Sequence, residues 1–406
     1  MKILVLNAGS SSQKSCLYEL NQEQLPIHPP EPLWEGFIDW SYQPGVAEIK
    51  VKNHHNIAFN ESIPITSKAE IIAHLIQTMW QGETKVIDSL DEINVVGHRV
   101  VHGGDKYRES TLITPDVKQA IERFSMFAPV HNPANLEGIQ SIENILGEKI
   151  PQIAVFDTAF HANLPEYAAV YPIPYQLSED GIRRYGFHGI SHQYVAQRTA
   201  QILGKNLAKL NLITCHLGNG CSLAAISKGR SIDTTMGFTP LSGLMMGARS
   251  GDIDPGILIY LIREKNYTAE QLDTMLNRQS GLQGVSGISN DMRKITEAIK
   301  QGNKRAKLAY DIYIHRLASL IGSMLASLGG IDALVFTAGM GENSAQIRSD
   351  VCQKFRFLGL EIDSQQNESN PVDADISTSE SSAHILVIHT EEDWAIAQEC
   401  WKKYSG

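Results

Sequence analysis

The sequence lacks the features that mark secreted, zinc-binding and membrane-spanning proteins. Its five cysteines form no CxxC pair and show no zinc-ligand spacing, so we interpret them as reduced thiols of a cytosolic protein. The N-terminal apolar run is short and leads into a polar turn, unlike a secretory signal. The most apolar helical stretch, residues 317–328, is interrupted by serines and a glycine and is too short to span a bilayer. We therefore expect a cytoplasmic protein without a membrane partner.

Two common nucleotide-binding signatures are also missing. There is no GxGxxG fingerprint, and the run from Gly9 to Lys14 lacks the second glycine of a Walker A loop. That run also enters a predicted strand, where a Walker A loop would enter a helix. The formal net charge of -10 disfavours nucleic acid as a partner, although a few arginines in a cleft suffice to bind a small anion.

One short pattern occurs twice, about half a chain apart. The apolar run 3–6 ends at Asn7 and turns through Gly9 towards Lys14, and the run 212–215 ends at His216 and turns through residues 218–220. Both runs predict a strand, a tight turn and a second strand. Consecutive backbone N–H groups in such turns suit phosphates. The repeat predicts two related halves that face one nucleotide, and 406 residues are enough for two domains.

Strands and helices are predicted to alternate along the rest of the chain, which is typical of α/β layers. Residues 21–66 contain several prolines, and we expect short strands and loops there. Thr114 and Pro115 begin a predicted helix, and Gly329 and Gly330 end another. The other expected strands are residues 93–101, 153–156, 333–336 and 385–388, and the helices are 67–80, 132–146, 191–203, 306–328 and 391–402.

Polar residues stand where several of these apolar strands end, which is where open α/β sheets bind ligands. They are Asn7, Asp157 and His216, while Arg99 lies within a strand. A single carboxylate at a strand end, such as Asp157, is more often structural than catalytic. The guanidinium of Arg99 in a run of valines and glycines needs an anion, which is either a protein carboxylate or a ligand.

Further charged residues lie in loop-like stretches. Arg249 and Arg293 either pair with their neighbours Asp252 and Asp291 or join Arg99 in a clamp around a phosphate. Among the fourteen histidines, His131, His188 and His216 stand out by their glycine- or asparagine-rich contexts. The acidic run 391–393 either complements a helix N-terminus or supplies a carboxylate to Mg²⁺.

Nine separate blocks make the sequence similar to the acetate kinases, of the acetate and sugar kinase, Hsc70 and actin superfamily. The blocks are NAGSSSQK, GHRVVHGG, PVHNP, VFDTAFH, YGFHGISH, CHLGNGCS, MGARSGDIDP, SNDMR and FTAGMGENS. The resemblance implies an α/β, two-domain, duplicated ribonuclease H-like (actin-like ATPase) fold with an active-site cleft between the domains. We expect residues 1–156 with 394–406 as one domain and 157–393 as the other. It also implies reversible transfer of the ATP γ-phosphoryl group to acetate, Mg²⁺ or Mn²⁺, and a homodimer.

The resemblance also assigns roles to individual residues. The catalytic residues would be Asp157, His188 and Arg249. The acyl substrate would meet Arg99, Val101, Val130, His131, Phe187 and Pro240. The metal would meet Asn7 and Glu392, with Glu391 and Asp393 as alternatives to Glu392. The nucleotide would meet Lys14, His216, Leu217, Gly218, Asn219, Gly220, Asp291, Met292, Arg293, Gly339, Met340, Gly341, Glu342 and Asn343.

Some departures and rival activities accompany this resemblance. Gln13, Ala248 and Glu391 stand where the family commonly has leucine, threonine and asparagine. Because a carboxylate acceptor is already ionised at neutral pH, we expect Asp157 to orient other groups and not to act as a general base. A propionate or broader short-chain acyl kinase is the main alternative, because one methylene in an apolar pocket discriminates weakly. A non-catalytic nucleotide-binding protein and a sugar kinase fit less well, because the acceptor side offers arginine and apolar groups.

Overall fold

The computed structural model describes residues 1–9, 12–21, 23–129 and 131–405. The chain forms two compact units, Met1–Ala159 with the C-terminal residues from Glu391, and Phe160–Thr390. This division assigns Asp157, Glu392 and Asp393 to the first unit, whereas the sequence placed the domain boundaries at 156/157 and 393/394. Those domain boundaries stay a prediction.

The first unit is built on an eight-stranded sheet in the order β5-β4-β3-β2-β1-β6-β8-β7. Its strands are β1 (Lys2–Ala8), β2 (Ser12–Glu19), β3 (Trp34–Gln43), β4 (Val46–Asn53), β5 (Ala58–Pro64), β6 (Ile93–Val100), β7 (Thr111–Leu112) and β8 (Gln152–Phe156). The predicted N-terminal hairpin is confirmed, since β1 and β2 pair antiparallel with Asn7 opposite Lys14.

Residues 21–66 are more regular than their prolines predicted. They form three long strands, β3, β4 and β5, which extend the sheet beyond β2 by antiparallel pairing. Strand β4 alternates buried and exposed side chains, so one of its faces packs on the core. The prolines lie before β3, at Pro44 between β3 and β4, and at Pro64 where β5 ends, so they interrupt no central ladder.

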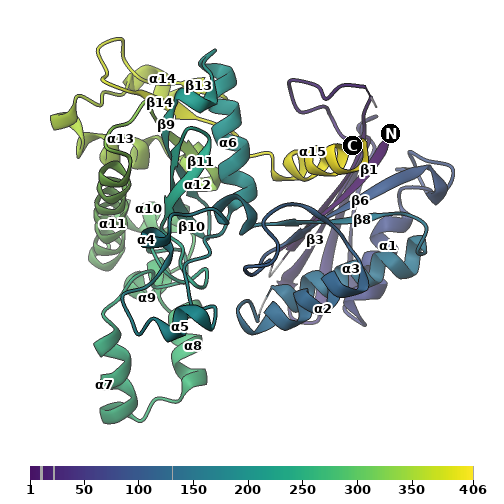
Figure 1. The fold of residues 1–406 in the computed structure, drawn as a ribbon, viewed down its shortest axis with the longest axis horizontal. Helices are drawn as coiled ribbons and strands as arrows, with labels where there is room; N and C mark the ends of the chain where they lie inside the picture. Colours follow the sequence, from purple (N-terminus) through teal and green to yellow (C-terminus); the bar gives the residue numbers. More distant parts are fainter. Residues whose placement is uncertain (10–11, 22, 130, 406) are drawn as a thin grey trace. The chain divides into compact units, whose positions relative to one another are not determined.

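Helices cover both faces of this sheet (Figure 1). They are α1 (Lys68–Gln77), α2 (Pro115–Arg123), α3 (Asn132–Leu146) and α15 (Glu392–Ser405), with 3₁₀ turns η1 (Leu90–Glu92) and η2 (Phe124–Met126). The predicted start of α2 is confirmed, because the Thr114 hydroxyl accepts from Val117 N–H and Pro115 occupies the first turn. On one face, Trp34, Leu4 and Leu6 pack with α1. On the other, Gly97 lets α15 approach β6 closely, and an added Cβ would lie 2.5 Å from Cys400 Sγ.

The second unit is built on a six-stranded sheet in the order β11-β10-β9-β12-β14-β13. Its strands are β9 (Asn211–Leu217), β10 (Cys221–Ser227), β11 (Arg230–Thr234), β12 (Ala333–Thr337), β13 (Ala374–Asp375) and β14 (His384–Val387). Its longer helices are α6 (Gly189–Ile202), α7 (Pro255–Lys265), α8 (Ala269–Arg278), α10 (Met292–Lys300), α11 (Lys304–Leu328) and α13 (Ala345–Gln353). Shorter ones are α4 (Glu166–Ala169), α5 (Gln176–Glu179), α9 (Gly281–Ser286), α12 (Ala338–Asn343) and α14 (Ser364–Glu368), with 3₁₀ turns η3 (Ala159–His161), η4 (Leu207–Lys209) and η5 (Arg356–Leu358).

Five strands in each sheet share one order and one set of directions. In the first unit β3, β2 and β1 are antiparallel, and β6 and β8 follow parallel to β1. In the second unit β11, β10 and β9 are antiparallel, and β12 and β14 follow parallel to β9. The repeated hairpin in the sequence is therefore the start of a repeated fold, and the predicted α/β duplication is confirmed.

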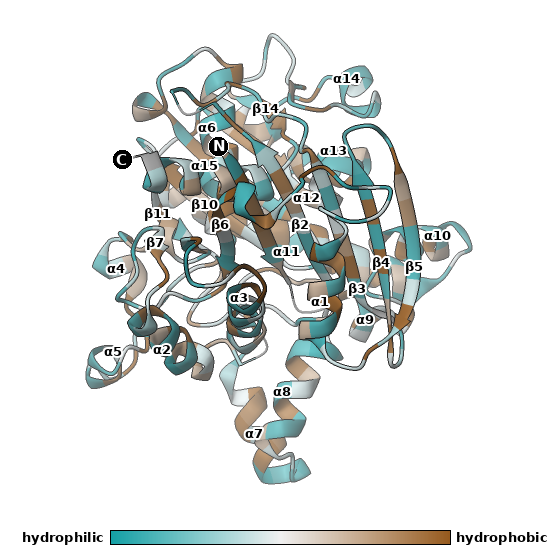
Figure 2. Ribbon diagram, turned by 90° about the vertical axis from the view of Figure 1, so that its right-hand side faces the viewer, coloured by the Kyte–Doolittle hydropathy of each residue, from teal (hydrophilic) through white to brown (hydrophobic). Residues whose placement is uncertain are grey.

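Helices α6 and α11 lie on opposite faces of the second sheet (Figure 1). Gly329 ends α11 in the left-handed conformation, with φ 70°, as its sequence predicted. Helices α7 and α8 project together from this unit, and apolar residues lie along α7 (Figure 2). None of the α7 side chains is buried. Throughout the described residues, no helix has both the length and the apolar character that a membrane crossing needs. All five cysteines are free and buried, as expected.

Candidate active site

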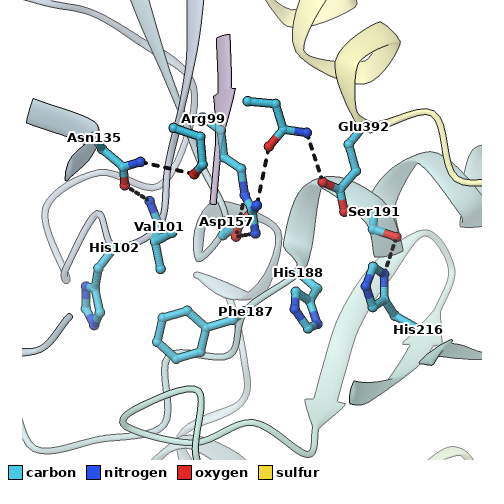
Figure 3. Close-up of polar contacts among 12 residues, drawn as sticks. Arg99, Val101, His102, Asn135, Asp157, Phe187, His188, Ser191, His216 and Glu392 are labelled. Carbon is cyan, nitrogen blue, oxygen red and sulfur yellow. Dashed lines mark hydrogen bonds and ion pairs between the residues drawn. The ribbon is translucent and has the colours of Figure 1, made fainter. Parts of the chain in front are cut away.

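Arg99 and Asp157 form a buried ion pair at one edge of the first sheet (Figure 3). Arg99 lies on β6, and Asp157 directly follows the neighbouring parallel strand β8. Asp157 Oδ2 accepts from Arg99 Nη2 at 2.6 Å and from Nε at 3.0 Å. Arg99 Nη1 donates to Asn7 Oδ1 at 3.3 Å. The anion that the sequence required beside Arg99 is therefore a protein carboxylate.

The electrostatics of this pair favour a permanent positive charge on Arg99. Burial alone would lower the pKa of Arg99, but Asp157 and Glu392 raise it above its ordinary value. Burial raises the pKa of Asp157, and Glu392 adds to this effect while Arg99 opposes it. The side chain of Arg99 is 16% exposed and that of Asp157 only 2%. The guanidinium can therefore attract a second anion from solvent, whereas Asp157 holds it in place.

Asn7 also reaches the acidic start of α15. Its Nδ2 donates to Glu392 Oε2 at 3.2 Å and to Asp393 Oδ1 at 3.0 Å. The other oxygen of Asp393 lies 2.7 Å from Lys14 Nζ. Burial would lower the pKa of Lys14, but the charge of Asp393 raises it above its usual value. Lys14, which the resemblance assigns to the nucleotide, is thus anchored by Asp393, and its nucleotide contact stays a prediction.

The oxygens of this corner fit Mg²⁺ better than a metal that needs a full protein cage. Within the parts of the chain that the structure describes, no cluster of three or more His, Cys, Asp or Glu side chains could hold a metal. Mg²⁺ keeps several waters and needs only one or two protein oxygens beside phosphates. Asn7 and Glu392 offer an amide and a carboxylate, and they lie within hydrogen-bond distance of each other.

Two asparagines that the sequence did not single out hold the turn after β6. Asn135 Oδ1 accepts from Val101 N–H at 3.1 Å (Figure 3), and Asn132 Oδ1 accepts from His102 N–H at 3.1 Å. Both asparagines are buried on α3. They fix the buried Val101, which the resemblance assigns to the substrate pocket. Of the other predicted pocket residues here, His131 precedes the first turn of α3, and Val130 lies outside the described residues.

His188 and its neighbours form the corresponding corner of the second unit. His188 precedes α6 in a left-handed conformation, with φ 57° and ψ 24°, and follows the buried Phe187. Its Nδ1 lies 2.9 Å from Ser222 Oγ on β10. Its ring stacks on that of His216, with centroids 4.2 Å apart. Ser191 Oγ lies 2.8 Å from His216 Nδ1 (Figure 3). Each of the two rings is therefore held by one serine.

Arg249 joins this corner through the turn between β9 and β10. A Cβ added to Gly220 would lie 3.5 Å from both Arg249 Nη1 and His188 Nε2, so the two predicted catalytic side chains converge on Gly220. Arg249 Nη1 donates to the carbonyl of Pro240 at 3.3 Å. Asp252, the neighbour considered as an alternative partner of Arg249, accepts with Oδ1 from Ser242 Oγ and Gly243 N–H, and its Oδ2 lies 3.9 Å from Arg316 Nη2.

A pocket of about 970 Å³ opens beside this turn within the second unit. It is lined by eight residues that the resemblance assigns to the nucleotide: Gly218, Asn219, Asp291, Met292, Arg293, Gly339, Met340 and Asn343. The other six of that set, Lys14, His216, Leu217, Gly220, Gly341 and Glu342, are not among its lining residues. Five lining residues were missed, namely Asn290, Thr296, Glu297, Lys300 and Ser344. Thr296 and Lys300 stand four residues apart on α10 and share one face of that helix, but such spacing alone marks no nucleotide site in a sequence.

Three of the assigned nucleotide residues, Asp291, Arg293 and Glu342, make polar contacts within the second unit. Arg293 binds its neighbour Asp291 through Nη2 at 2.7 Å, so the local pairing that the sequence left open is present. The Glu342 carboxylate accepts from the backbone N–H groups of Ala338 at 2.7 Å and Thr390 at 3.1 Å. Glu342 therefore links the segment that follows β12 to the segment that follows β14 through hydrogen bonds.

Comparison with known proteins gives a consistent result along the whole chain. Residues 2–398 match the acetokinase family. The acetate kinase of Cyanothece sp. is 62% identical over 402 residues, which cover 99% of this chain and 98% of that protein. The crystal structure of Porphyromonas gingivalis acetate kinase matches with a TM-score of 0.89 at 40% identity and covers 99% of both chains. A propionate kinase from Francisella tularensis has a TM-score of 0.89 at 41% identity, also over 99% of both chains. The chain belongs to the acetokinase family.

Proposed function

We propose that the protein is an acetate kinase, which transfers the γ-phosphoryl group of ATP reversibly to acetate and forms acetyl phosphate and ADP. Membership of the acetokinase family over residues 2–398 is the observation that carries this proposal. The curated relatives at about 60% identity are named acetate kinase, which favours acetate over the larger acids.

We assign the binding of the acceptor, acetate, to Arg99. An acetate carboxylate is ionised at neutral pH, so it needs a cation and not a general base. The Arg99 guanidinium supplies that charge, and Asp157 and Asn7 fix its orientation through three hydrogen bonds of 2.6 to 3.3 Å. The apolar Val101, together with Val130, Phe187 and Pro240, is proposed to contact the methyl group. In this proposal, Asp157 positions Arg99 and takes no proton from the substrate.

We assign the binding of the phosphoryl donor, ATP, to the second unit. We assign the nucleotide to the pocket of about 970 Å³ beside the turn 218–220 and helix α10. His188 and Arg249 converge beside that turn, where His188 would donate a hydrogen bond to the transferred phosphoryl group and Arg249 would neutralise the charge that develops on it. The transfer needs little covalent chemistry from the protein, because positioning and charge neutralisation supply most of the acceleration.

We assign the metal to Asn7 and Glu392, with Mg²⁺ as the physiological ion and Mn²⁺ as a substitute. When bound, the ion would neutralise phosphate oxygens and orient them for in-line transfer. Asp393 is the less suitable ligand, because its ion pair with Lys14 already neutralises its charge. Glu392 is therefore preferred to its neighbours. We also propose a cytoplasmic location, in keeping with the free thiols.

The second candidate is a propionate or broader short-chain acyl kinase. The Francisella tularensis propionate kinase is as similar in fold as the acetate kinase of known structure. A difference of one methylene is worth about 1–3 kcal/mol in an apolar pocket. Weak turnover of propionate is therefore expected beside turnover of acetate.

The decisive experiment measures acyl phosphate. The purified protein is incubated with Mg-ATP and acetate, propionate, butyrate or glucose, and the product is trapped with hydroxylamine. A strong signal with acetate, a weaker one with propionate and none with glucose is expected. Equal or stronger signal with propionate would favour the broader acyl kinase. Absence of product with every acid, despite ATP binding, would contradict the proposal and favour a regulatory nucleotide-binding protein.

We further propose that the protein is a homodimer and that α7 contributes to the contact between copies. Four large apolar residues of this helix are 46% to 52% exposed: Ile257, Ile259, Tyr260 and Ile262. Because the helix buries none of its own residues, its apolar side chains lie in water unless another molecule covers them. A second copy presents the same apolar face and is the partner that a symmetric contact requires.

A further inference from the structure

Three buried polar side chains connect β9, α6 and β10 to His188. Thr214 Oγ1 lies 2.7 Å from His192 Nδ1, and His192 Nε2 lies 2.8 Å from Ser222 Oγ. Ser222 Oγ in turn lies 2.9 Å from His188 Nδ1. Thr214, His192 and Ser222 are all fully buried. They form one line of hydrogen bonds that ends at a proposed catalytic histidine.

The pattern of protons along this line is restricted by the number of hydrogens available. Burial lowers the pKa of His192 well below its ordinary value, so its ring is neutral and carries one N–H. The Ser222 hydroxyl has one hydrogen and faces a ring nitrogen on each side, so it donates to one ring and accepts from the other. Two patterns satisfy these conditions, and they run in opposite directions.

The buried Thr214 hydroxyl decides between the two patterns. Within the described part of the chain, His192 Nδ1 is the one hydrogen-bond partner of Thr214 Oγ1. If His192 carried its proton on Nδ1, Thr214 would accept that bond and its own hydroxyl hydrogen would be buried without an acceptor. Such an unsatisfied buried group is costly. Thr214 therefore donates to Nδ1, His192 donates from Nε2 to Ser222, and Ser222 donates to Nδ1 of His188.

We propose that Thr214, His192 and Ser222 form a relay of hydrogen bonds that holds His188 in the tautomer with its proton on Nε2. Nε2 is the nitrogen that lies next to the Gly220 position, beside Arg249 Nη1. In this tautomer the neutral ring presents an N–H donor there. The opposite tautomer would present a lone pair to phosphoryl oxygens and would repel them. The three residues are positioning residues for His188.

This inference rests on the proposed function only for its effect on the rate. The tautomer of His188 is a property of the resting protein and can be measured whether or not the protein is a kinase. Two variants at one position separate the hydroxyl from the packing. Thr214→Val removes the hydroxyl and keeps the branched shape in a buried strand, and Thr214→Ser keeps the hydroxyl.

The test combines nitrogen NMR with steady-state kinetics on the full chain. Protein with ¹⁵N-labelled histidine is examined by long-range ¹H–¹⁵N correlation, and the signal of His188 is assigned by its loss in His188→Gln. We expect His188 to show protonated Nε2 and unprotonated Nδ1 in the original protein and in Thr214→Ser. In Thr214→Val we expect a mixture of tautomers and a kcat that falls about tenfold or more, with KM for ATP within about threefold.

The possible outcomes test the hydrogen-bond relay independently of the proposed kinase activity. A proton on Nδ1 of His188 in the original protein would overturn the relay. So would a Thr214→Val protein with unchanged histidine signals and unchanged kcat. Equal losses of kcat in Thr214→Ser and Thr214→Val, without any change in tautomer, would also overturn it and indicate a packing role. If the original protein makes no acyl phosphate, the proposed function fails, while the nitrogen signals still decide the relay.

Discussion

Asp157 accepts two hydrogen bonds from Arg99 with a single oxygen, Oδ2, at 2.6 and 3.0 Å. The Asp157 side chain is 2% exposed and that of Arg99 16%, and Asn7 contacts the remaining terminal nitrogen of the guanidinium. The carboxylate that looks catalytic in the sequence is therefore committed to holding an arginine. Its removal should act on the acceptor substrate through Arg99.

The first prediction compares Asp157→Asn with Asp157→Ala. The amide oxygen of asparagine can still accept from Arg99, so kcat should fall by less than about a hundredfold. Alanine leaves the buried guanidinium unpaired, so kcat should fall by more than about a thousandfold and the free energy of unfolding by about 3–5 kcal/mol. Acyl phosphate formation and urea denaturation measure these effects. A loss above about a thousandfold in Asp157→Asn would show that the charge itself, and not the orientation, is required.

The second prediction concerns the metal. Glu392→Gln should raise the Mg²⁺ concentration for half-maximal rate about tenfold or more, because a neutral amide oxygen is a weaker ligand than a carboxylate. Asp393→Asn is the matched control, since it removes a neighbouring carboxylate that is already bound to Lys14. It should lower stability and leave the Mg²⁺ dependence within about twofold. Initial rates against free Mg²⁺ test both variants, and an unchanged Mg²⁺ dependence in Glu392→Gln would remove that residue from the site.

The sequence predicted much of the fold because local signals agreed with it. The Thr114 cap, the Pro115 start and the Gly329 stop each work through backbone geometry within a few residues, and all three are found as predicted. The length of strands β3 to β5 was underestimated because the prolines there were interpreted as interruptions. The prolines lie before the strands and at their ends, and the alternation of apolar and charged residues along 47–52 was the stronger signal.

The candidate site likewise contains residues that the sequence predicted and residues that it did not. Glycine turns and strand ends pointed to Gly218 and Asp157, because such features can be recognised in the sequence from neighbouring residues alone. Sequence reasoning missed Ser222 and His192, since they meet only after β10 pairs with β9 and α6 packs on the sheet. The same holds for Asn135, which reaches Val101 across 34 positions of the chain. Contacts of this kind depend on tertiary packing and leave no local pattern.

The third prediction is a loss of stability in mild acid. Burial lowers the pKa of His98, His102 and His161 to about 4, and it lowers that of His192 well below its ordinary value. The unfolded chain protonates its histidines near pH 6.5, so it binds more protons than the folded chain between pH 6.5 and pH 4. The stability that these groups contribute is complete above about pH 6.5 and is lost as the pH falls.

At pH 5 each of His98, His102 and His161 should cost roughly 1–2 kcal/mol of unfolding free energy relative to pH 7, and His192 acts in the same direction. The raised pKa of Asp157 acts in the opposite sense, but it is one group against four. Urea midpoints at pH 7 and pH 5 measure the change, and His98→Gln should reduce it by the share of one group. Equal midpoints at the two pH values would contradict the prediction.

The fourth prediction tests the proposed contact between copies. Ile259→Asp places a charge on the apolar face of α7, where the original side chain is 50% exposed. A dimer that buries this face should dissociate, and light scattering should show half the original mass. Leu112→Asp is the control, because Leu112 is 52% exposed on the other unit. A dimer that persists in Ile259→Asp would place the contact elsewhere.

The last prediction uses the empty space beside Gly220. An added Cβ would lie 3.4 Å from His188 Cε1 and 3.5 Å from Arg249 Nη1, which are ordinary contact distances. Gly220→Ala should therefore fold normally, yet its methyl group would occupy the point where His188 and Arg249 converge. We expect kcat to fall about a hundredfold, because a displacement of about 1 Å costs that much in a positioned site.

Gly322→Ala is the matched control for Gly220→Ala. Gly322 lies within α11 with no atom within 4 Å of the added Cβ, so the change should stabilise the protein by about 0.5–1 kcal/mol and leave kcat unchanged. Thermal denaturation and acyl phosphate formation measure the two variants side by side. If Gly220→Ala kept the original kcat, the transferred group would not pass between His188 and Arg249, and both residues would lose their proposed role.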